Sequence, residues 1–454
     1  MSTDVVILAA GQGSRMKSKL PKVMHRLAGK PMVQHVIDNA RALGEVNLHV
    51  VIGHGADQVQ SALSDQSLRF AVQLEQLGTG HAVAQALPSI GEDAQVLVLY
   101  GDVPLTRPET FEALLKIAAQ GHLGLLTVAL ADPTGYGRII RNPVGDVVAI
   151  VEHKDATDEQ RQIAEVNTGI MALPAQYLHE WLPQLSSDNA QGEYYLTDVI
   201  AMAADNGVRV QAIQPGCEQE VQGVNNRSQL AALERWHQMQ LAEQLMTEGV
   251  TLADPARIDV RGALSVGRDI SIDINCIFEG TVEIGDDVRI GPNCLIRNCR
   301  IGAGTVVEAN SVIDGTVVES ACVIGPFARL RPGTELAEGV KVGNFVETKK
   351  ARIGQGSKVN HLSYVGDALI GRDVNVGAGT ITCNYDGVNK SLTEIGDGAF
   401  IGSNSALVAP VSVGAGATVG AGSTLTKAVG DGELAVARGK QSNISGWKRP
   451  VKRS

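Results

Sequence analysis

The sequence predicts a two-part protein, in which an N-terminal α/β domain with a mostly parallel, Rossmann-like sheet is followed by a left-handed parallel β-helix. Two observations lead to this prediction. Between Ile284 and Leu425 an aliphatic residue returns about every six positions, a period that fits neither a helix nor a half-buried strand. Before this region, buried strand patterns alternate with amphipathic helical patterns, which is typical of a parallel sheet covered by helices.

The six-residue units indicate a solenoid in which each unit forms one flat side and three units close a triangular coil. The unit-opening residues form runs at Ile395, Ile401, Leu407, Val413, Val419 and Leu425, at Val318, Ile324, Leu330, Leu336, Val342 and Thr348, and from Ile353 and Ile370. We expect each opener to point into the coil, where burying an aliphatic side chain stabilises the fold by roughly 1.5–3 kcal/mol. Glycine after an opener is expected at bends, where it permits positive φ. Five-residue spacings, such as Ile313 to Val318, are interpreted as tightened corners.

Composition limits the classes of partner. The chain has 454 residues and a net charge of −10, so it offers no basic field for nucleic acid. We find no apolar run long enough for a membrane span and no signal peptide in the first residues, and we therefore expect a cytoplasmic protein. Cys276, Cys294 and Cys322 each follow an opener by four positions. This regularity favours small buried thiols over a disulfide framework or a metal site.

The first strand leads into a glycine-rich turn. Residues 4–10 form an apolar, β-branched run, and Gly11-Gln12-Gly13-Ser14-Arg15-Met16 follows. Met16 stands where a dinucleotide-binding fingerprint has its third glycine, so that motif is absent. Backbone N–H groups of such a turn can bind phosphate, and Arg15 and Lys22 can stabilise its charge. An ordinary turn with surface cations is the alternative.

Further strands are expected at 48–53, 95–101 and 124–130, and helices at 32–43 and 108–120. Asp102 follows the strand at 95–101, at the carboxyl edge where ligands of parallel sheets bind. Its carboxylate suits a phosphate-bound Mg²⁺, although a turn cap is equally consistent with one aspartate. Leucines at helical spacing over 228–248, ended by Gly249, predict a helical linker. The expected domains are 1–227, the linker 228–249, and 250–454.

Two breaks in the solenoid pattern suggest a site. Residues 382–390 are an insertion between units, and such projecting segments are candidate binding loops. Arg331, Lys349, His361 and Tyr364 recur at about one coil length, so they would stack as a polar patch with two cations suited to a sugar phosphate. For His361 alone, a histidine on a flat solvent-exposed face is the alternative.

Several motifs together carry a family resemblance. They are residues 8–16 with Pro21-Lys22, 76–82 (QLGTGHA), 100–105 (YGDVPL), 135–138 (GYGR), 151–154 (VEHK), 165–169 (EVNTG) and 223–226 (GVNN). This set resembles the sugar-1-phosphate nucleotidyltransferases. Joined to hexapeptide repeats, it resembles the bifunctional bacterial family that combines an N-acetylglucosamine-1-phosphate uridylyltransferase with a glucosamine-1-phosphate N-acetyltransferase. That family makes UDP-N-acetylglucosamine, a precursor of bacterial cell wall and lipopolysaccharide.

The resemblance implies residue roles in the first domain. Asp102 and Asn225 would hold Mg²⁺, and Arg15 and Lys22 would face the phosphates of UTP. The uridine pocket would be lined by Leu8, Ala9, Ala10, Gly11, Gln73, Gly78 and Thr79. The N-acetylated sugar and its phosphates would contact Tyr100, Gly101, Gly137, Glu152 and Asn167.

For the solenoid, the resemblance implies that His361 is the general base of acetyl transfer. Arg331 and Lys349 would bind the sugar phosphate, with Tyr364 and Asn375 on the sugar. Acetyl-CoA would contact Ala378, Asn384, Tyr385, Ser403, Ala421 and Arg438. A homotrimer through the β-helix, with sites at subunit interfaces, is also implied.

Two other functions remain to be distinguished at this point. A nucleotidyltransferase with a single activity would use the β-helix only for oligomerisation or regulation, and would need neither His361 nor the loop at Asn384-Tyr385. A non-catalytic nucleotide sensor would not need Asp102 and Asn225 together with Arg15 and Lys22. The basic tail at 447–453 is interpreted as a solvated end, with contact to the CoA phosphates as the alternative.

Overall fold

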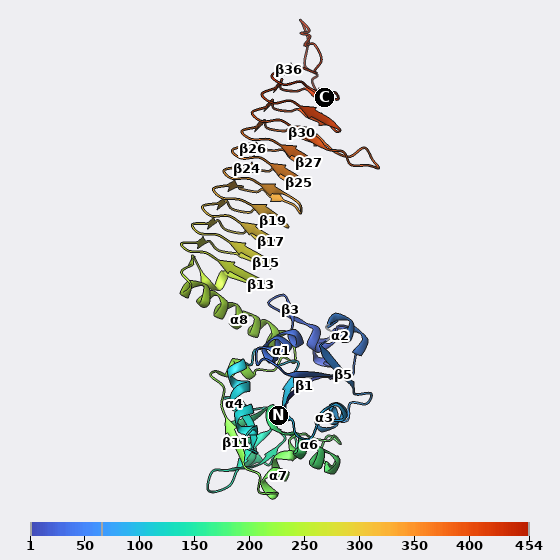
Figure 1. Cartoon of the computed structure of the whole chain (residues 1–454), viewed down its shortest axis with the longest axis vertical. Coiled ribbons are helices and arrows are strands. Elements are labelled where there is room, and N and C mark those ends of the chain that lie inside the picture. Colours follow the sequence, from blue (N-terminus) through green and yellow to red (C-terminus); the bar gives the residue numbers. More distant parts are fainter. Residues whose placement is uncertain (1, 65–66, 453–454) are drawn as a thin grey trace. The chain divides into compact units, whose positions relative to one another are not determined.

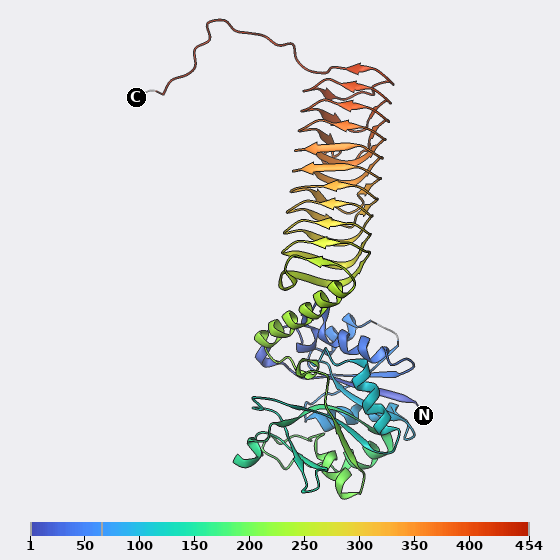
Figure 2. The same ribbon diagram turned by 90° about the vertical axis from the view of Figure 1, so that its left-hand side faces the viewer.

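The computed structural model describes residues 2–64 and 67–452. The chain folds into two compact units that meet in sequence between His237 and Gln238. The first unit is α/β and the second is a coiled stack of short parallel strands (Figures 1 and 2). Each unit is described by itself below.

The first unit is built on a mostly parallel sheet, as the sequence predicts. Its strand order is β11-β7-β10-β6-β1-β4-β5, with the bounds β1 (Thr3–Ala9), β4 (Asn47–Ile52), β5 (Leu68–Val72), β6 (Gln95–Tyr100), β7 (Leu123–Ala129), β10 (Glu165–Pro174) and β11 (Val210–Ile213). Strand β10 runs antiparallel to both of its neighbours. A hairpin of β8 (Arg138–Arg141) and β9 (Val147–Val151) extends from it. These antiparallel strands had no signal in the alternating pattern.

Helices cover both faces of this sheet because its central strand is apolar on both sides. In β1, Val5 and Ile7 belong to one buried cluster, whereas Val6 and Leu8 belong to the other. The first cluster includes α1 (Met32–Arg41), α2 (Ala56–Ala62) and α4 (Pro108–Ala118); the second includes α3 (Thr79–Ala86), α6 (Ala175–Trp181) and α7 (Asp198–Asp205). Strand β1 is flanked by β6 and β4, both parallel to it. The strand order reverses here, and ligands of parallel sheets bind at such a point.

A helix occupies the region where the leucine spacing predicts one. Helix α8 runs from Arg227 to Thr247 and crosses the sequence boundary between the two units. Leu233 on this helix packs with Leu27, Met32 and Val224 of the first unit. The short helix α5 (Asp158–Arg161) begins with a capping box formed by Thr157 and Gln160.

The second unit is a parallel β-helix whose coils have three sides. One side is β12 (Thr251–Leu252), β14 (Ser271–Ile272), β16 (Arg289–Ile290), β18 (Val306–Val307), β21 (Val323–Ile324), β24 (Lys341–Asn344), β26 (Lys358–His361), β28 (Asn375–Val376), β31 (Phe400–Ile401), β34 (Thr418–Val419) and β36 (Leu434–Ala435). The next side is β13 (Ile258–Val266), β15 (Cys276–Ile284), β17 (Leu295–Ile301), β19 (Val312–Asp314), β22 (Arg329–Leu330), β25 (Glu347–Ile353), β27 (Tyr364–Ile370), β29 (Ile381–Cys383), β32 (Ala406–Val408) and β35 (Thr424–Leu425). The longest of these strands bend onto a third side with β20 (Val317–Val318), β23 (Glu335–Leu336), β30 (Thr393–Ile395) and β33 (Val411–Val413).

The residues predicted to open the six-residue units form the core of the solenoid. All of the openers named above, from Val318 to Leu425, are buried. The five-residue spacings are tightened corners: the residue with positive φ comes two positions after the opener, as at Gly315 and Lys350. In the six-residue units it comes three positions after, as at Gly398 and Asn404.

The expectation for glycine directly after an opener is wrong. Gly354, Gly377 and Gly402 do not have a positive φ, whereas residues two positions later do, including Gly356 and Gly379. A Cβ added to Gly402 would lie 2.5 Å from the backbone N of Ala421, and one added to Gly354 would lie 2.5 Å from the backbone of Gly371. Glycine is therefore needed at this place because neighbouring coils approach closely, and not because of its φ.

The cysteine prediction is confirmed. Cys276, Cys294 and Cys322 are free thiols and buried. The Sγ atoms of Cys276 and Cys294 donate weak hydrogen bonds to carbonyl oxygens of the following coil. Among the helices of the described residues, none combines the length and the apolar character that crossing a bilayer requires.

The register of the openers can be tested with a matched pair of substitutions. Ile401 is fully buried, whereas its neighbour Phe400 is 49% exposed. Ile401→Asp places an unpaired carboxylate in the core and should destabilise the second unit by roughly 3–5 kcal/mol, whereas Phe400→Asp should have little effect. Thermal unfolding measures both. Equal melting temperatures for the two variants would contradict the register.

Candidate active sites

A cavity of about 300 Å³ lies at the carboxyl ends of β1 and β6. Its lining includes many of the residues that the resemblance indicates: Leu8, Ala9, Ala10, Gly11, Lys22, Gln73, Gly78, Thr79, Tyr100 and Asp102. Gly101 connects the last two and donates its N–H to the carbonyl oxygen of Leu8 (2.9 Å). The reversal of strand order at β1 therefore produces a pocket where it was expected.

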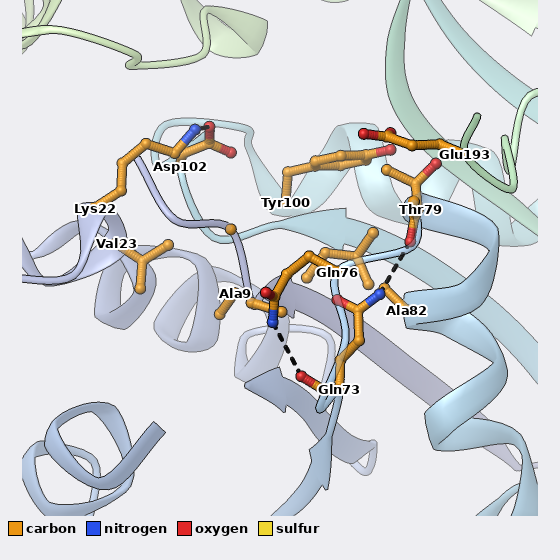
Figure 3. A pocket seen from close by; sticks show the side chains of 14 residues that line it. Ala9, Lys22, Val23, Gln73, Gln76, Thr79, Ala82, Tyr100, Asp102 and Glu193 are labelled. Atoms are coloured by element: carbon orange, nitrogen blue, oxygen red, sulfur yellow. Dashed lines mark hydrogen bonds and ion pairs between the residues drawn. The ribbon is translucent and has the colours of Figure 1, made fainter. Parts of the chain in front are cut away.

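Four polar side chains converge at one end of the cavity. Lys22 Nζ contacts a carboxylate oxygen of Asp102 and donates to Asn225 Oδ1 at 3.1 Å. Arg15 Nη2 donates to the same Asn225 oxygen at 2.9 Å. Figure 3 shows Lys22 and Asp102 together at this end. The backbone brings Asn225 close because Val224 N–H donates to the carbonyl oxygen of Asp102 (2.9 Å).

The glycine-rich turn gives Lys22 its position. Gly13 has a φ of +61°, and a Cβ there would lie 2.6 Å from the Cβ of Lys22. Glycine therefore allows both the left-handed turn and the close approach of Lys22. Met16, which stands where a dinucleotide-binding fingerprint has its third glycine, is buried. It therefore belongs to the core and not to a phosphate-binding loop.

The donor set at this end suits a hard divalent cation. Asp102 offers a carboxylate and Asn225 an amide oxygen, and both already contact cationic groups. Within the described residues, no three His, Cys, Asp or Glu side chains gather in a metal-binding arrangement. Mg²⁺ is commonly held by one or two protein oxygens, with substrate phosphates and water as the remaining ligands. The residues therefore fit Mg²⁺ in the presence of a triphosphate.

At the opposite end of the cavity, glutamine side-chain amides and backbone carbonyl oxygens form a hydrogen-bonded network. Gln73 is almost fully buried, and its Nε2 donates to the carbonyl oxygen of Gly78 (3.1 Å). Gln76 Nε2 donates in turn to the carbonyl oxygen of Gln73 (3.1 Å), as Figure 3 shows. Gly78 has a φ of +111°, and a Cβ there would lie 2.6 Å from the Tyr194 carbonyl oxygen. This close approach places Glu193 on the cavity wall.

Tyr100 lies between the cation end and a second group of polar residues. Burial raises the pKa of its phenol, and the charges of Glu152 and Asp102 raise it further. Burial also raises the pKa of the Glu152 carboxyl, although the hydrogen bond from Thr197 Oγ1 (3.2 Å) opposes the shift. A Cβ on Gly137 would lie 3.2 Å from Glu152 Oε1, and Asn167 N–H donates to the Gly137 carbonyl oxygen (2.9 Å). Tyr100, Gly137, Glu152 and Asn167 are thus brought together.

In the solenoid, charged side chains of alternating sign form a ladder from coil to coil. This alternation ends at the predicted patch. Residues at equivalent places on successive coils are Arg261, Glu279, Arg297, Asp314, Arg331 and Lys349. In the lower coils, opposite charges face each other, as in Arg261–Glu279 (3.1 Å) and Arg297–Asp314 (3.9 Å). Arg331 and Lys349, in contrast, are two cations in succession. Arg331 pairs with Glu347 on its own side (2.8 Å).

The insertion loop adds Lys390 to Arg331 and Lys349, and we call these three residues the cationic group. The loop projects between β29 and β30 (Figure 1). The nearby Lys349 ammonium lowers the pKa of Lys390. Lys349 Nζ lies 4.0 Å from Asp367, whose carboxylate also accepts from Asn384. The Tyr364 hydroxyl lies over Gly366, since a Cβ there would be 2.4 Å from it.

One corner of the solenoid collects most of the other residues that the resemblance indicates. His361, Ala378, Ser403 and Ala421 each follow a buried opener by two positions. Hydrogen bonds link this corner from coil to coil: Gly379 N to His361 O (3.2 Å), Asn404 N to Ala378 O (2.7 Å), Gly422 N to Ser403 O (2.8 Å), and Arg438 Nη1 to Ala421 O (2.7 Å). We call His361, Ala378, Ser403 and Ala421 the corner column.

The corner column leads into the side of the solenoid that carries the cationic group, because β27 begins three residues after His361 and its Gly366 is opposite Lys349. Only Leu362 and Ser363 separate His361 at the end of β26 from Tyr364 at the start of β27, so the two Cα atoms are at most about 11 Å apart. Asn375 lies on β28, next to Lys358 of β26. Tyr385 is 59% exposed on the insertion loop and pairs with Lys390.

Comparison with known proteins gives matches along nearly the whole chain. The profile of the MobA-like NTP transferase domain matches residues 5–189, that of the GMPPB C-terminal domain residues 260–353, and that of the bacterial transferase hexapeptide repeats residues 392–427. The protein named "Bifunctional protein GlmU" of Marinobacter nauticus is 65% identical over 99% of both chains. Its namesakes from Cellvibrio japonicus (99% of this chain, 100% of the relative) and Pseudoalteromonas atlantica (100% of both) are 62% and 58% identical.

The chain belongs to the bifunctional GlmU family. The family resemblance stated from the sequence motifs is therefore confirmed, as are the nucleotidyltransferase and hexapeptide acyltransferase parts of the enzyme. A GlmU-family enzyme acts on small molecules, nucleotides among them. Neither the single-activity enzyme nor the nucleotide sensor agrees with this membership.

Some residues near both sites were not identified from the sequence. Gln76 belongs to a motif that was recognised, so its signal was present. Glu193 lies outside every motif and reaches the cavity only through the contact between the Gly78 and Tyr194 segments. Lys390 was part of the predicted binding loop, but its approach to Lys349 depends on how the loop folds. Asp367 could have been found only from the register of β25 and β27.

Proposed function

We propose that the corner column and the cationic group form the acetyltransferase site, and that the cavity at β1 and β6 is the uridylyltransferase site. The enzyme makes UDP-N-acetylglucosamine in two steps. It acetylates glucosamine-1-phosphate and then couples the product to UTP with release of pyrophosphate. The observation that carries the assignment is that Arg331, Lys349 and Lys390 gather on the side of the solenoid that β27 enters three residues after His361. A phosphate-binding group and a base are then on adjoining parts of the coil.

In acetyl transfer, the sugar amine attacks the thioester carbonyl of acetyl-CoA. The C–N bond forms, the C–S bond breaks, and the CoA sulfur leaves as a thiolate. His361 takes the proton that the nitrogen loses. Arg331, Lys349 and Lys390 bind the phosphate, with Tyr364 and Asn375 on the sugar. Acetyl-CoA binds along Ala378, Ser403 and Ala421, where side chains are small, and contacts Asn384, Tyr385 and Arg438.

In uridylyl transfer, the sugar phosphate oxygen attacks the α-phosphorus of UTP in line, and pyrophosphate leaves. Catalysis of this step depends on positioning and on charge stabilisation. Arg15 and Lys22 balance the negative charge of the phosphates. Gln73, Gly78 and Thr79 bind the uracil end, whereas Tyr100, Gly137, Glu152 and Asn167 hold the acetylated sugar. Asp102 and Asn225 would hold Mg²⁺, which would supply positive charge to offset that of the triphosphate.

The proposal includes a homotrimer assembled through the β-helix. An exposed apolar strip at one corner, formed by Phe327, Phe345 and Leu362, supports this assembly. The two phenyl rings stack with centroids 5.3 Å apart, and the three side chains are 50–63% exposed. Contiguous exposed apolar groups of this kind are typical of protein interfaces.

Removing the metal-binding carboxylate should separate the two activities. Asp102→Ala should abolish most uridylyl transfer and leave acetyl transfer intact, because only the phosphate reaction needs a divalent cation. Pyrophosphate release and free-thiol formation measure the two reactions. Asp57→Ala, at an exposed aspartate of α2, is the control and should leave both unchanged. If EDTA stops both reactions equally, the assignment of the metal to one site is wrong.

The base is tested by His361→Ala. The amine of an amino sugar should titrate near the α-amino range of about 7.7–8.0, so a base is needed at neutral pH. General-base catalysis contributes about 10²–10⁴-fold, and the acetylation kcat should fall by that factor. KM for acetyl-CoA should change little, since the base acts in the transition state. A loss of only a few-fold, in a variant that light scattering shows to be trimeric, would refute the role of His361.

A further inference from the structure

The His361 ring has a side-chain partner that the motifs did not indicate. Strands β24 and β26 are parallel neighbours, and Asn344 is the residue opposite His361. The two side chains therefore stack one coil apart. Nδ1 of His361 lies 2.8 Å from Oδ1 of Asn344. Like the members of the corner column, Asn344 follows a buried opener, Val342, by two positions.

This contact determines the tautomer of the histidine. An amide oxygen can only accept a hydrogen bond, so Nδ1 must carry the hydrogen and donate it. In the neutral ring, Nε2 then keeps its lone pair. A general base needs that lone pair directed at the proton it removes. Asn344 thus leaves the outward nitrogen of His361 ready to act as a base.

The residues that follow this contact have the left-handed backbone that recurs at this corner of the solenoid. Phe345 and Leu362, which directly follow Asn344 and His361, have positive φ values of 56° and 49°. Phe327, one coil below Phe345, also has a φ of 56°, so this conformation belongs to the corner of the coil. The coils above have Gly379 and Asn404 at the equivalent places. The carbonyl oxygen of His361 also accepts from Ser363 Oγ (2.9 Å) and Gly379 N (3.2 Å).

We propose that Asn344 is a positioning residue for acetyl transfer, which holds the ring of His361 with Nε2 free to accept the proton of the sugar amine. The proposal rests on the proposed role of His361 as the base. A neutral amide has an advantage over a carboxylate at this place. It orients the ring without adding negative charge next to the cations that bind the sugar phosphate.

Two substitutions separate positioning from a general structural role. Asn344→Ala removes the acceptor and should lower the acetylation kcat about 10–100-fold, less than the loss of the base itself, whereas both KM values stay within about two-fold. Asn344→Asp keeps an acceptor and should recover most of kcat at high pH. Because an anion favours the protonated ring, the acidic limb of its kcat/KM profile should move to higher pH.

A matched control removes an asparagine contact between two coils that lie far from His361. Asn293 accepts a hydrogen bond from Asn275 at a distant part of the solenoid (2.9 Å). Asn293→Ala should leave both activities unchanged. If Asn344→Ala is as active as the unchanged enzyme, or if Asn344→Asp is as impaired as Asn344→Ala at every pH, the proposal is wrong.

The double variant distinguishes this proposal from the assignment of His361. In a His361→Ala background, Asn344→Ala should cause no further loss, because the two residues act as one unit. An equal loss in both backgrounds would mean that Asn344 acts on something other than the base. A His361→Ala enzyme with nearly full acetylation would instead refute the base itself, whatever the Asn344 variants do.

Discussion

Successive coils of the second unit are hydrogen-bonded as parallel strands, and the remaining features of that unit depend on the register of this pairing. Ile277 pairs with Leu295 and Lys341 with Lys358, offsets of 18 and 17 residues. A side chain at a given place on one coil therefore lies beside its equivalent on the next. Buried openers form the core in this way, alternating charges form a ladder, and the corner column brings together residues up to 60 positions apart, from His361 to Ala421.

The same constraint explains where the pattern is broken. Asn375 pairs with Phe400, an offset of 25 residues, so the additional residues between them cannot remain in the wall and form the projecting loop. The charge ladder changes from alternating signs to two cations on the coils below this loop. Both departures occur on the coils around His361. We therefore assign stability to the regular part of the solenoid and the proposed acetyl transfer to its irregular part.

Much of this architecture could be predicted from sequence, since the six-residue period determines which side chains are buried. The same period also located His361 and Lys349 on neighbouring coils. Contacts that depend on the exact register were harder to predict: Asn344 lies 17 residues before His361 and belongs to no recognised motif. The role of glycine after an opener was misread, because the spacing of neighbouring coils is not visible in one unit. In the first unit, the pattern located Asp102, but Glu193 enters the pocket through a loop contact that no local pattern encodes.

We propose that the corner column beginning at His361 and the cationic group together form one acetyltransferase site. A crystal structure of the enzyme with CoA and glucosamine-1-phosphate tests it most directly. We predict that CoA lies along Ala378, Ser403 and Ala421, that the phosphate contacts Arg331 and Lys349, and that His361 Nε2 lies within about 3 Å of the sugar amine, as a base requires. CoA bound at a different corner, or an amine beyond the reach of His361, would contradict the account.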